Sequence, residues 1–136
     1  MEYGMQNTDK ILVFTCNWNA YSGLETAGLQ RRTYSAAVHP IKVMCLGDLS
    51  PGIILKAFDH GAAGVLLLDC PPDECHYEFG NRRAQEMFTV TSKLARLLGY
   101  SPRQFRLDQV AAGDGESWVE KVQSFVAGLN GNGGPL

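Results

Sequence analysis

The sequence predicts a doubly wound α/β domain in which a mostly parallel four-stranded sheet carries helices on both faces. Three observations indicate this class: strand-like and helix-like segments alternate, three of the strand-like runs are almost continuously apolar, and Gly or Pro residues separate the segments. At 136 residues the chain has the size of one domain. We therefore expect a single α/β domain over residues 1–130 and a flexible tail over residues 131–136.

Four segments have the composition of β-strands. The runs Lys10–Cys16, Ile41–Gly47 and Gly64–Cys70 are apolar and typical of strands covered on both faces, and Gln104–Val110 is a more polar fourth strand. Right-handed crossovers between parallel strands favour the flavodoxin-like strand order 2-1-3-4.

Two short helices are predicted from their start and stop signals. Ser22, with Glu25 three positions later, has the arrangement of a capping box and opens the first helix. Ser50 followed by Pro51 opens the second, and Gly61 is its expected stop.

Two longer helices follow from apolar periodicity, and they span Asn81–Leu98, which Gly99 ends, and Glu116–Leu129. Each is expected to bury the apolar residues that recur at spacings of three and four. These are Ala84, Met87, Phe88, Val90, Leu94, Leu97 and Leu98 in the first helix, and Trp118, Val119, Val122, Phe125, Val126 and Leu129 in the second.

Charge and hydropathy exclude several classes of function. The formal net charge of −2 and the pI near 5.9 give no electrostatic footprint for nucleic acid or an anionic membrane. No apolar segment approaches the ~20 residues of a membrane span, and the first residues lack the layout of a signal peptide. We expect a cytoplasmic protein with no membrane insertion, in which cysteines serve as metal ligands or reactive thiols.

The four cysteines follow the predicted strands. Cys16 ends the first strand, Cys45 lies at the end of the second, Cys70 ends the third, and Cys75 lies in the loop after it. Because the carboxyl ends of parallel strands share one edge of a sheet, and neighbouring strands lie ~4.8 Å apart, we expect the thiols to converge there. This arrangement predicts a metal site.

Thiolate ligation is compatible with zinc or with iron and sulfur. Structural zinc sites favour two close cysteine pairs, whereas only Cys70 and Cys75 are close here, as C-x4-C. Four thiolates are the number that a [2Fe-2S] cluster needs. We therefore expect a [2Fe-2S] cluster rather than zinc.

Three blocks of the sequence resemble the delta subunit family of methyl-viologen-reducing hydrogenase. They are CNWNAYSG at Cys16–Gly23, VMCLG at Val43–Gly47 and DCPPDECHYEFGN at Asp69–Asn81, and their order and spacing match the family forms CNWC-x-Y, VMC-x-G and GCH-x-GDCHY-x-x-GN. The resemblance covers most of the chain.

The resemblance implies a small, non-catalytic electron-transfer subunit. It implies a [2Fe-2S] cluster bound by Cys16, Cys45, Cys70 and Cys75. The implied partners are a heterodisulfide reductase A-like flavoprotein and a hydrogenase, a formate dehydrogenase or a reductase module of anaerobes. The subunit would pass electrons between them.

Two residues near the cysteines differ from the family pattern, and two others belong to the expected site. Asn19 stands where the family has a second cysteine, and Pro71 stands where it has a histidine. Asn19 is a poor replacement ligand because a neutral oxygen donor suits soft iron badly. His76 would donate to a cluster sulfur or cap its loop, and Trp18 would shield the cluster or simply pack.

Other functions find little support in the chain. Asp69 resembles the phosphoacceptor of a receiver domain, but the first strand ends without the paired acids that would hold magnesium there. A hydroxyl-rich flavin phosphate loop, the GxGxxG and GxxxxGK[ST] motifs and the C-x-x-C redox motif are missing. The alternative that stays open is a non-catalytic docking or structural subunit whose thiols bind zinc or no metal.

Overall fold

The computed structural model describes residues 10–16, 38–69, 80–111 and 113–129, which contain a four-stranded sheet. The strands are β1 (Ile11–Cys16), β2 (Val38–Val43), β3 (Gly64–Asp69) and β4 (Phe105–Gln109). Every pairing is parallel, and the order is β2-β1-β3-β4. The predicted strand order and the parallel sheet are confirmed.

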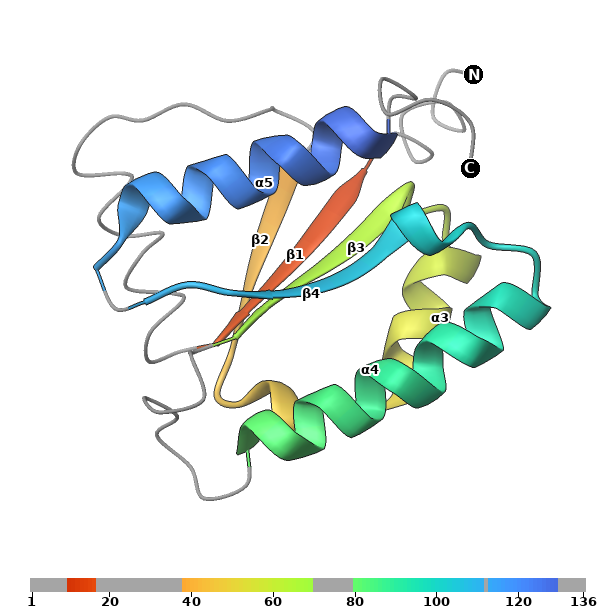
Figure 1. The fold of residues 1–136 in the computed structure, drawn as a ribbon. Helices are drawn as coiled ribbons and strands as arrows, with labels where there is room; N and C mark the ends of the chain where they lie inside the picture. The colour runs from red at the N-terminus through yellow and green to blue at the C-terminus, as the bar shows by residue number, and fades with distance from the viewer. Residues whose placement is uncertain (1–9, 17–37, 70–79, 112, 130–136) are drawn as a thin grey trace.

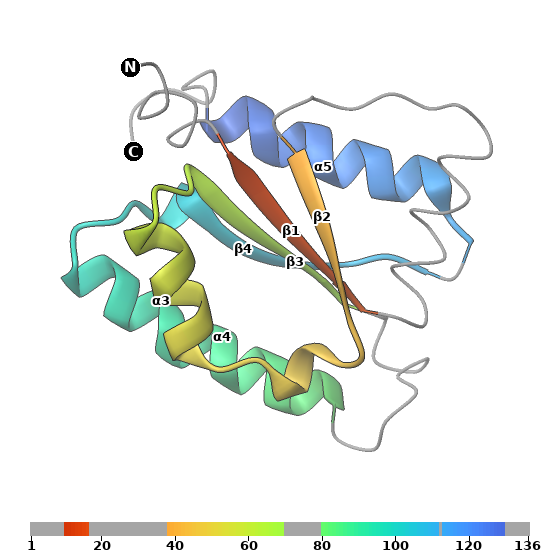
Figure 2. The same ribbon diagram turned by 180° about the vertical axis from the view of Figure 1, so that it is seen from behind.

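Helices cover both faces of this sheet, as Figures 1 and 2 show from opposite sides. Helices α3 (Pro51–Asp59) and α4 (Gly80–Leu97) lie on one face, and α5 (Gly115–Leu129) lies on the other. Short 3-10 helices, η1 (Leu46–Asp48) and η3 (Pro102–Gln104), precede α3 and β4. The doubly wound α/β class is confirmed, while the predicted helix from Ser22 and the tail over residues 131–136 lie outside the described residues.

Two buried clusters fill the space between the sheet and its helices. All six residues of β3 are buried, because this central strand carries side chains into both layers. Leu66 and Leu68 belong to the cluster under α5, while Val65 and Leu67 belong to the cluster under α3 and α4. The alternation of side chains along one strand thus joins the two halves of the core.

The residues predicted to start and stop the helices do so in the structure. Ser50 is the N-cap of α3, and its hydroxyl accepts a hydrogen bond from the backbone N–H of Ile53 at 3.4 Å. Gly61 and Gly99, the expected stops, have φ angles of 99° and 98°. This left-handed conformation ends a helix with little strain only where glycine is present.

The predicted bounds of the second strand were wrong. We expected Ile41–Gly47, whereas β2 spans Val38–Val43 and includes Pro40. Proline is tolerated because β2 is an edge strand of the described sheet and needs a hydrogen-bonded neighbour on one side only. The apolar residues after Val43 do not extend the strand but turn into η1, where Leu46 is fully buried.

The predicted buried side of α4 was also partly wrong. Ala84 and Met87 are buried as expected, but Thr91 and Ala95 continue the buried stripe. Among the remaining predicted positions, Phe88 is partly buried. The other side chains are exposed, namely those of Val90, Leu94, Leu97 and Leu98. Helix α4 therefore presents apolar residues to solvent as well as to the sheet. The predicted stripe of α5 is confirmed, with Val126 and Leu129 partly buried at its edge.

Replacing Gly64 by alanine should destabilise the fold, because α5 crosses very close to the start of β3. A methyl group at Gly64 would lie 2.6 Å from a methyl carbon of Leu129 and 3.0 Å from the ring of Phe125. We expect the free energy of unfolding to fall by about 1–3 kcal/mol, as for other overpacked sites. Urea unfolding followed by circular dichroism measures this change.

Gly128→Ala in α5 is the matched control. No heavy atom lies within 4 Å of a methyl group added there. Because alanine loses less backbone freedom in a helix, this variant should gain up to about 1 kcal/mol. Equal urea midpoints for the two variants would contradict the close packing of α5 on β3.

Candidate functional site

The carboxyl ends of the strands gather sulfur and carboxylate side chains at one edge of the sheet, which we call the carboxyl rim. Cys16 is the last residue of β1, and Asp69 is the last residue of β3. Cys45 lies two residues beyond the end of β2. Because β2 and β3 both pair directly with β1, these three positions belong to neighbouring strands.

Cys16 is buried in the layer beneath α5. Its side chain is 2% exposed, and it belongs to the same apolar cluster as Val110 and Trp118. Val110 directly follows β4, and its backbone N–H donates to the carbonyl oxygen of Asp69 at 2.9 Å. The thiol of Cys16 therefore lies at the rim but is shielded from bulk water by core side chains.

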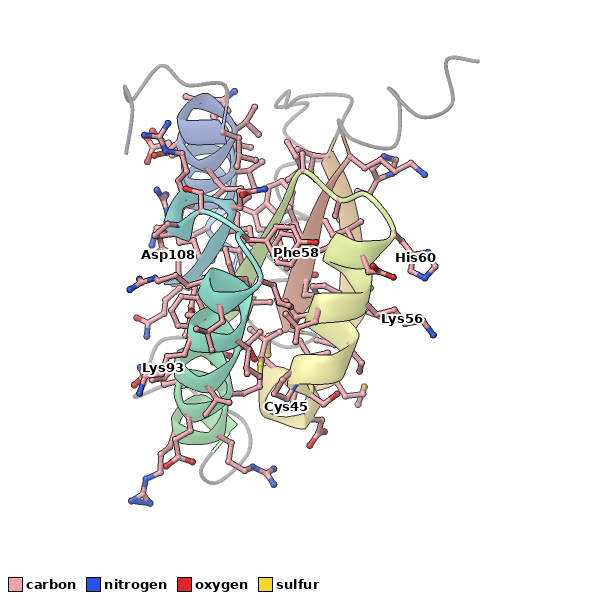
Figure 3. The ribbon with its side chains drawn as sticks, turned by 90° about the vertical axis from the view of Figure 1, so that its right-hand side faces the viewer. Cys45, Lys56, Phe58, His60, Lys93 and Asp108 are labelled. Carbon is pink, nitrogen blue, oxygen red and sulfur yellow. The ribbon has the colours of Figure 1, made fainter. Side chains whose placement is uncertain are left out.

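Cys45 is held by the turn that leads from β2 into α3. It is the N-cap residue of η1, and its carbonyl oxygen accepts a hydrogen bond from the backbone N–H of Asp48 at 3.0 Å. The next residue, Leu46, is buried in the cluster beneath α3 and α4 and anchors the turn. Figure 3 shows Cys45 at the end of the molecule where α3 and α4 begin.

The electrostatic surroundings of Cys45 disfavour a thiolate. Burial raises the pKa of the Cys45 thiol above its ordinary value, and a hydrogen bond from the backbone of Gly47 only partly opposes this rise. The negative charges of Asp48 and Asp69 and the nearby Cys16 raise the pKa further.

Two conclusions follow from these neighbours. Cys16 is among the groups that raise the pKa of Cys45, and the predicted convergence of the four thiols on one cluster stays a prediction. A deprotonated Cys45 also requires a nearby positive charge, which a thiolate-bound metal supplies. Two buried cysteine thiols are donors that zinc or an iron-sulfur cluster can use.

The remaining predicted site residues lie outside the described residues: they are Cys70, Cys75, Trp18, Asn19 and His76. Residues 10–16, 38–69, 80–111 and 113–129 contain no group of three His, Cys, Asp or Glu side chains that could hold a metal ion. The structure thus places Cys16 and Cys45 at the rim. The positions of Cys70 and Cys75 as ligands stay a prediction.

Asp69 is a rim residue that was not predicted as part of the site. Its side chain is 3% exposed, which is uncommon for a carboxylate. The sequence does contain a signal, since Asp69 ends a strand in which every preceding residue is apolar and buried. A charged residue at the end of such a strand faces the ligand edge of a parallel sheet.

None of the helices within the described part of the chain combines the length and the apolar character needed to cross a membrane.

Comparison with known proteins identifies several iron-sulfur and reductase subunits as similar. The chain is 38% identical over 109 residues to the iron-sulfur subunit of the F420-non-reducing hydrogenase vhc from Methanococcus voltae, covering 80% of this chain and 76% of that protein. It is 33% identical over 117 residues to the iron-sulfur subunit of an F420-non-reducing hydrogenase from Archaeoglobus profundus, covering 86% of this chain and 85% of that protein.

A third similarity involves a much longer protein. Over 119 residues the chain is 32% identical to the A-type subunit of ferredoxin:CoB-CoM heterodisulfide reductase from Methanosarcina mazei, covering 88% of this chain but only 15% of that protein. A segment of this size is therefore part of a larger reductase subunit in that organism. Residues 11–133 match the family described as methyl-viologen-reducing hydrogenase, delta subunit, and the chain belongs to this family.

Proposed function

We propose that this protein is an electron-transfer subunit in which Cys16, Cys45, Cys70 and Cys75 bind a [2Fe-2S] cluster. The observation that carries the proposal is the placement of two buried cysteines, Cys16 and Cys45, at the carboxyl ends of neighbouring strands. When bound, such a cluster accepts and donates one electron at a time. The names of the relatives from M. voltae and A. profundus, which include the words iron-sulfur subunit, support the assignment.

The residues of the chain would do three things for this group. The thiols of Cys16 and Cys45 would supply ligands from two neighbouring strands, which a folded sheet holds at a fixed separation. Core side chains around Cys16 would exclude water from one side. Asp69 would add a negative charge at the rim and so would favour the oxidised state over the more negative reduced state.

The proposed partners are large subunits of a cytoplasmic redox complex. A segment similar to this chain lies within a much longer heterodisulfide reductase protein, which favours a heterodisulfide reductase A-like flavoprotein as one partner. The hydrogenase names of the other relatives favour a hydrogenase as the second. A formate dehydrogenase or a reductase module would present the same task, which is to deliver electrons to the cluster.

Metal and sulfide analysis of protein purified without oxygen tests this proposal. We expect a brown protein with about two irons and two acid-labile sulfides per chain, as the four-thiolate [2Fe-2S] cluster requires. Reduction with dithionite should bleach its visible absorption and produce a paramagnetic signal. A colourless protein that contains zinc would contradict the cluster and would favour a structural subunit.

A further inference from the structure

We propose that the exposed surface of α4 is a docking face for a larger redox protein whose surface carries carboxylates around an apolar centre. The docking face is defined by Val90, Lys93, Leu94 and Leu97. The kind of partner depends on the function proposed above, whereas the surface features depend only on the described residues. The two ideas are therefore tested separately.

The docking face contains an apolar stripe that the fold does not use. The side chains of Val90, Leu94 and Leu97 are 51%, 39% and 83% exposed. Their spacing of four and three residues places them on one side of α4, next to the buried stripe. Single exposed apolar residues are ordinary, but a continuous stripe marks a surface that a partner covers.

Basic residues accompany this stripe. Arg82, Arg83, Lys93 and Arg96 are exposed on α4, where Glu86 is the only acidic residue. Arg83 approaches Asp48 at 3.6 Å, but both side chains are more than half exposed, so solvent screens the pair. A helix with this excess of positive charge stands out in a chain whose net charge is −2.

The charge distribution selects the occupant. A second copy of the chain bound symmetrically through α4 would bring the same basic residues together, which like-charge repulsion disfavours. An anionic membrane would meet the same basic residues, and vesicle flotation distinguishes it from a protein partner. A protein surface with acidic residues around an apolar patch satisfies both components of the docking face.

A separate cavity lies on the other flank of α4, outside the docking face. It has a volume of about 270 Å³, and its lining includes Phe88, Arg96, Tyr100 and Phe105. Arg96 therefore belongs to this flank of α4 and not to the docking face.

The position of α4 relates the docking face to the carboxyl rim. Helix α4 begins beside η1, at the end of the molecule that contains Cys45 (Figure 1 and Figure 3). Val90 lies ten residues after the start of α4, which corresponds to roughly 15 Å along the helix axis. The docking face thus runs from roughly 15 to 25 Å from the rim-side end of α4, and a large partner that also covers the first turns of the helix reaches the rim.

Binding to a purified heterodisulfide reductase A-like flavoprotein of the same organism tests the docking face. Isothermal titration calorimetry at low and high salt would compare the wild-type chain with Leu97→Asp and with the double variant Arg82→Glu and Lys93→Glu, whose two positions lie eleven residues apart on the same side of α4. We expect Leu97→Asp to weaken binding at least about tenfold, because it puts a charge in the apolar stripe. The double variant should weaken binding about tenfold at low salt and less at high salt.

Two α3 variants serve as matched controls. Ile53 is 47% exposed, and Lys56 projects from α3 away from α4 (Figure 3). Ile53→Asp and Lys56→Glu introduce the same chemical changes outside the docking face and should bind like the wild-type chain. Iron content is measured for every variant, so loss of the cluster is distinguished from loss of docking.

Four outcomes would overturn the docking proposal. They are wild-type affinity in both α4 variants, absence of binding by the wild-type chain, and equal loss of affinity in the α3 controls. The fourth is binding of the docking face to another occupant. This would appear as a dimer in sedimentation or as flotation with phosphatidylcholine–phosphatidylserine vesicles, and Leu97→Asp would abolish it.

Discussion

Cys45→Ser should purify without its iron and without visible absorption. Cys45 is buried at the carboxyl rim and is one of the four ligands of the proposed cluster. An oxygen ligand suits iron-sulfur chemistry poorly, and a cluster left with three thiolates should be lost during purification. We expect iron and sulfide near zero, measured by colorimetric assay, and electron transfer to the partner abolished.

Met44→Ser is the control for this variant. Met44 adjoins Cys45 in the chain, but its side chain is 55% exposed and is not a predicted ligand. We expect it to retain the full iron content. Cys70→Ser should lose iron like Cys45→Ser, with assembly into the complex partly preserved. Full iron and electron transfer in either cysteine variant would contradict the proposed cluster.

Trp118→Ala should cause the largest loss of stability. Trp118 is fully buried, and it belongs to the cluster that joins α5 to Cys16 and the carboxyl rim. Truncation of a buried tryptophan costs about 3–5 kcal/mol through lost burial and the cavity left behind. This loss is a large fraction of the ~5–15 kcal/mol that stabilises an ordinary domain.

Urea unfolding measures the effect of Trp118→Ala. Because the cavity opens beside the buried layer that contains Cys16, we also expect faster loss of iron from this variant on exposure to a chelator. Ser124→Ala, at an exposed position of the same helix, should change the free energy of unfolding by less than about 0.5 kcal/mol. A Trp118→Ala midpoint equal to that of Ser124→Ala would contradict the packing of α5.

The architecture was accessible from the sequence because two of its strands, β1 and β3, are strongly apolar and alternate with helical segments. A short run such as Gly64–Asp69, which follows the turn at Gly61, has the length and composition of a strand buried on both faces. Once the strands are parallel, the residues at their carboxyl ends share one edge, and this geometry places Cys16 and Cys45 together. The shared location followed from topology rather than from any local motif.

The bounds of β2 could not be predicted because the local sequence signals conflict. Pro40 counts against a strand in general, and the apolar residues Met44, Cys45 and Leu46 count in favour of one. The predicted strand order already placed this strand at an edge of the sheet, but only the three-dimensional structure shows that Pro40 lies within it and that Leu46 is buried as part of a turn. Neighbouring elements overrode the local preference.

The error in α4 has a chemical cause. Apolar periodicity treats threonine as polar, yet Thr91 is fully buried. Its hydroxyl donates a hydrogen bond to the sulfur of Met87 at 3.3 Å, so burial leaves no unsatisfied donor. With Thr91 and the small Ala95 facing the sheet, the larger Val90 and Leu94 are turned outward.

The inclusion of Pro40 in β2 has a consequence for the protein before it meets any partner. The outer edge of a sheet can recruit a strand from another molecule and seed aggregation. Proline offers no N–H to such an incoming strand, and exposed Lys42 adds a charge that repeated stacking would have to bury. The freshly synthesised chain is thereby protected from self-templated growth along this edge.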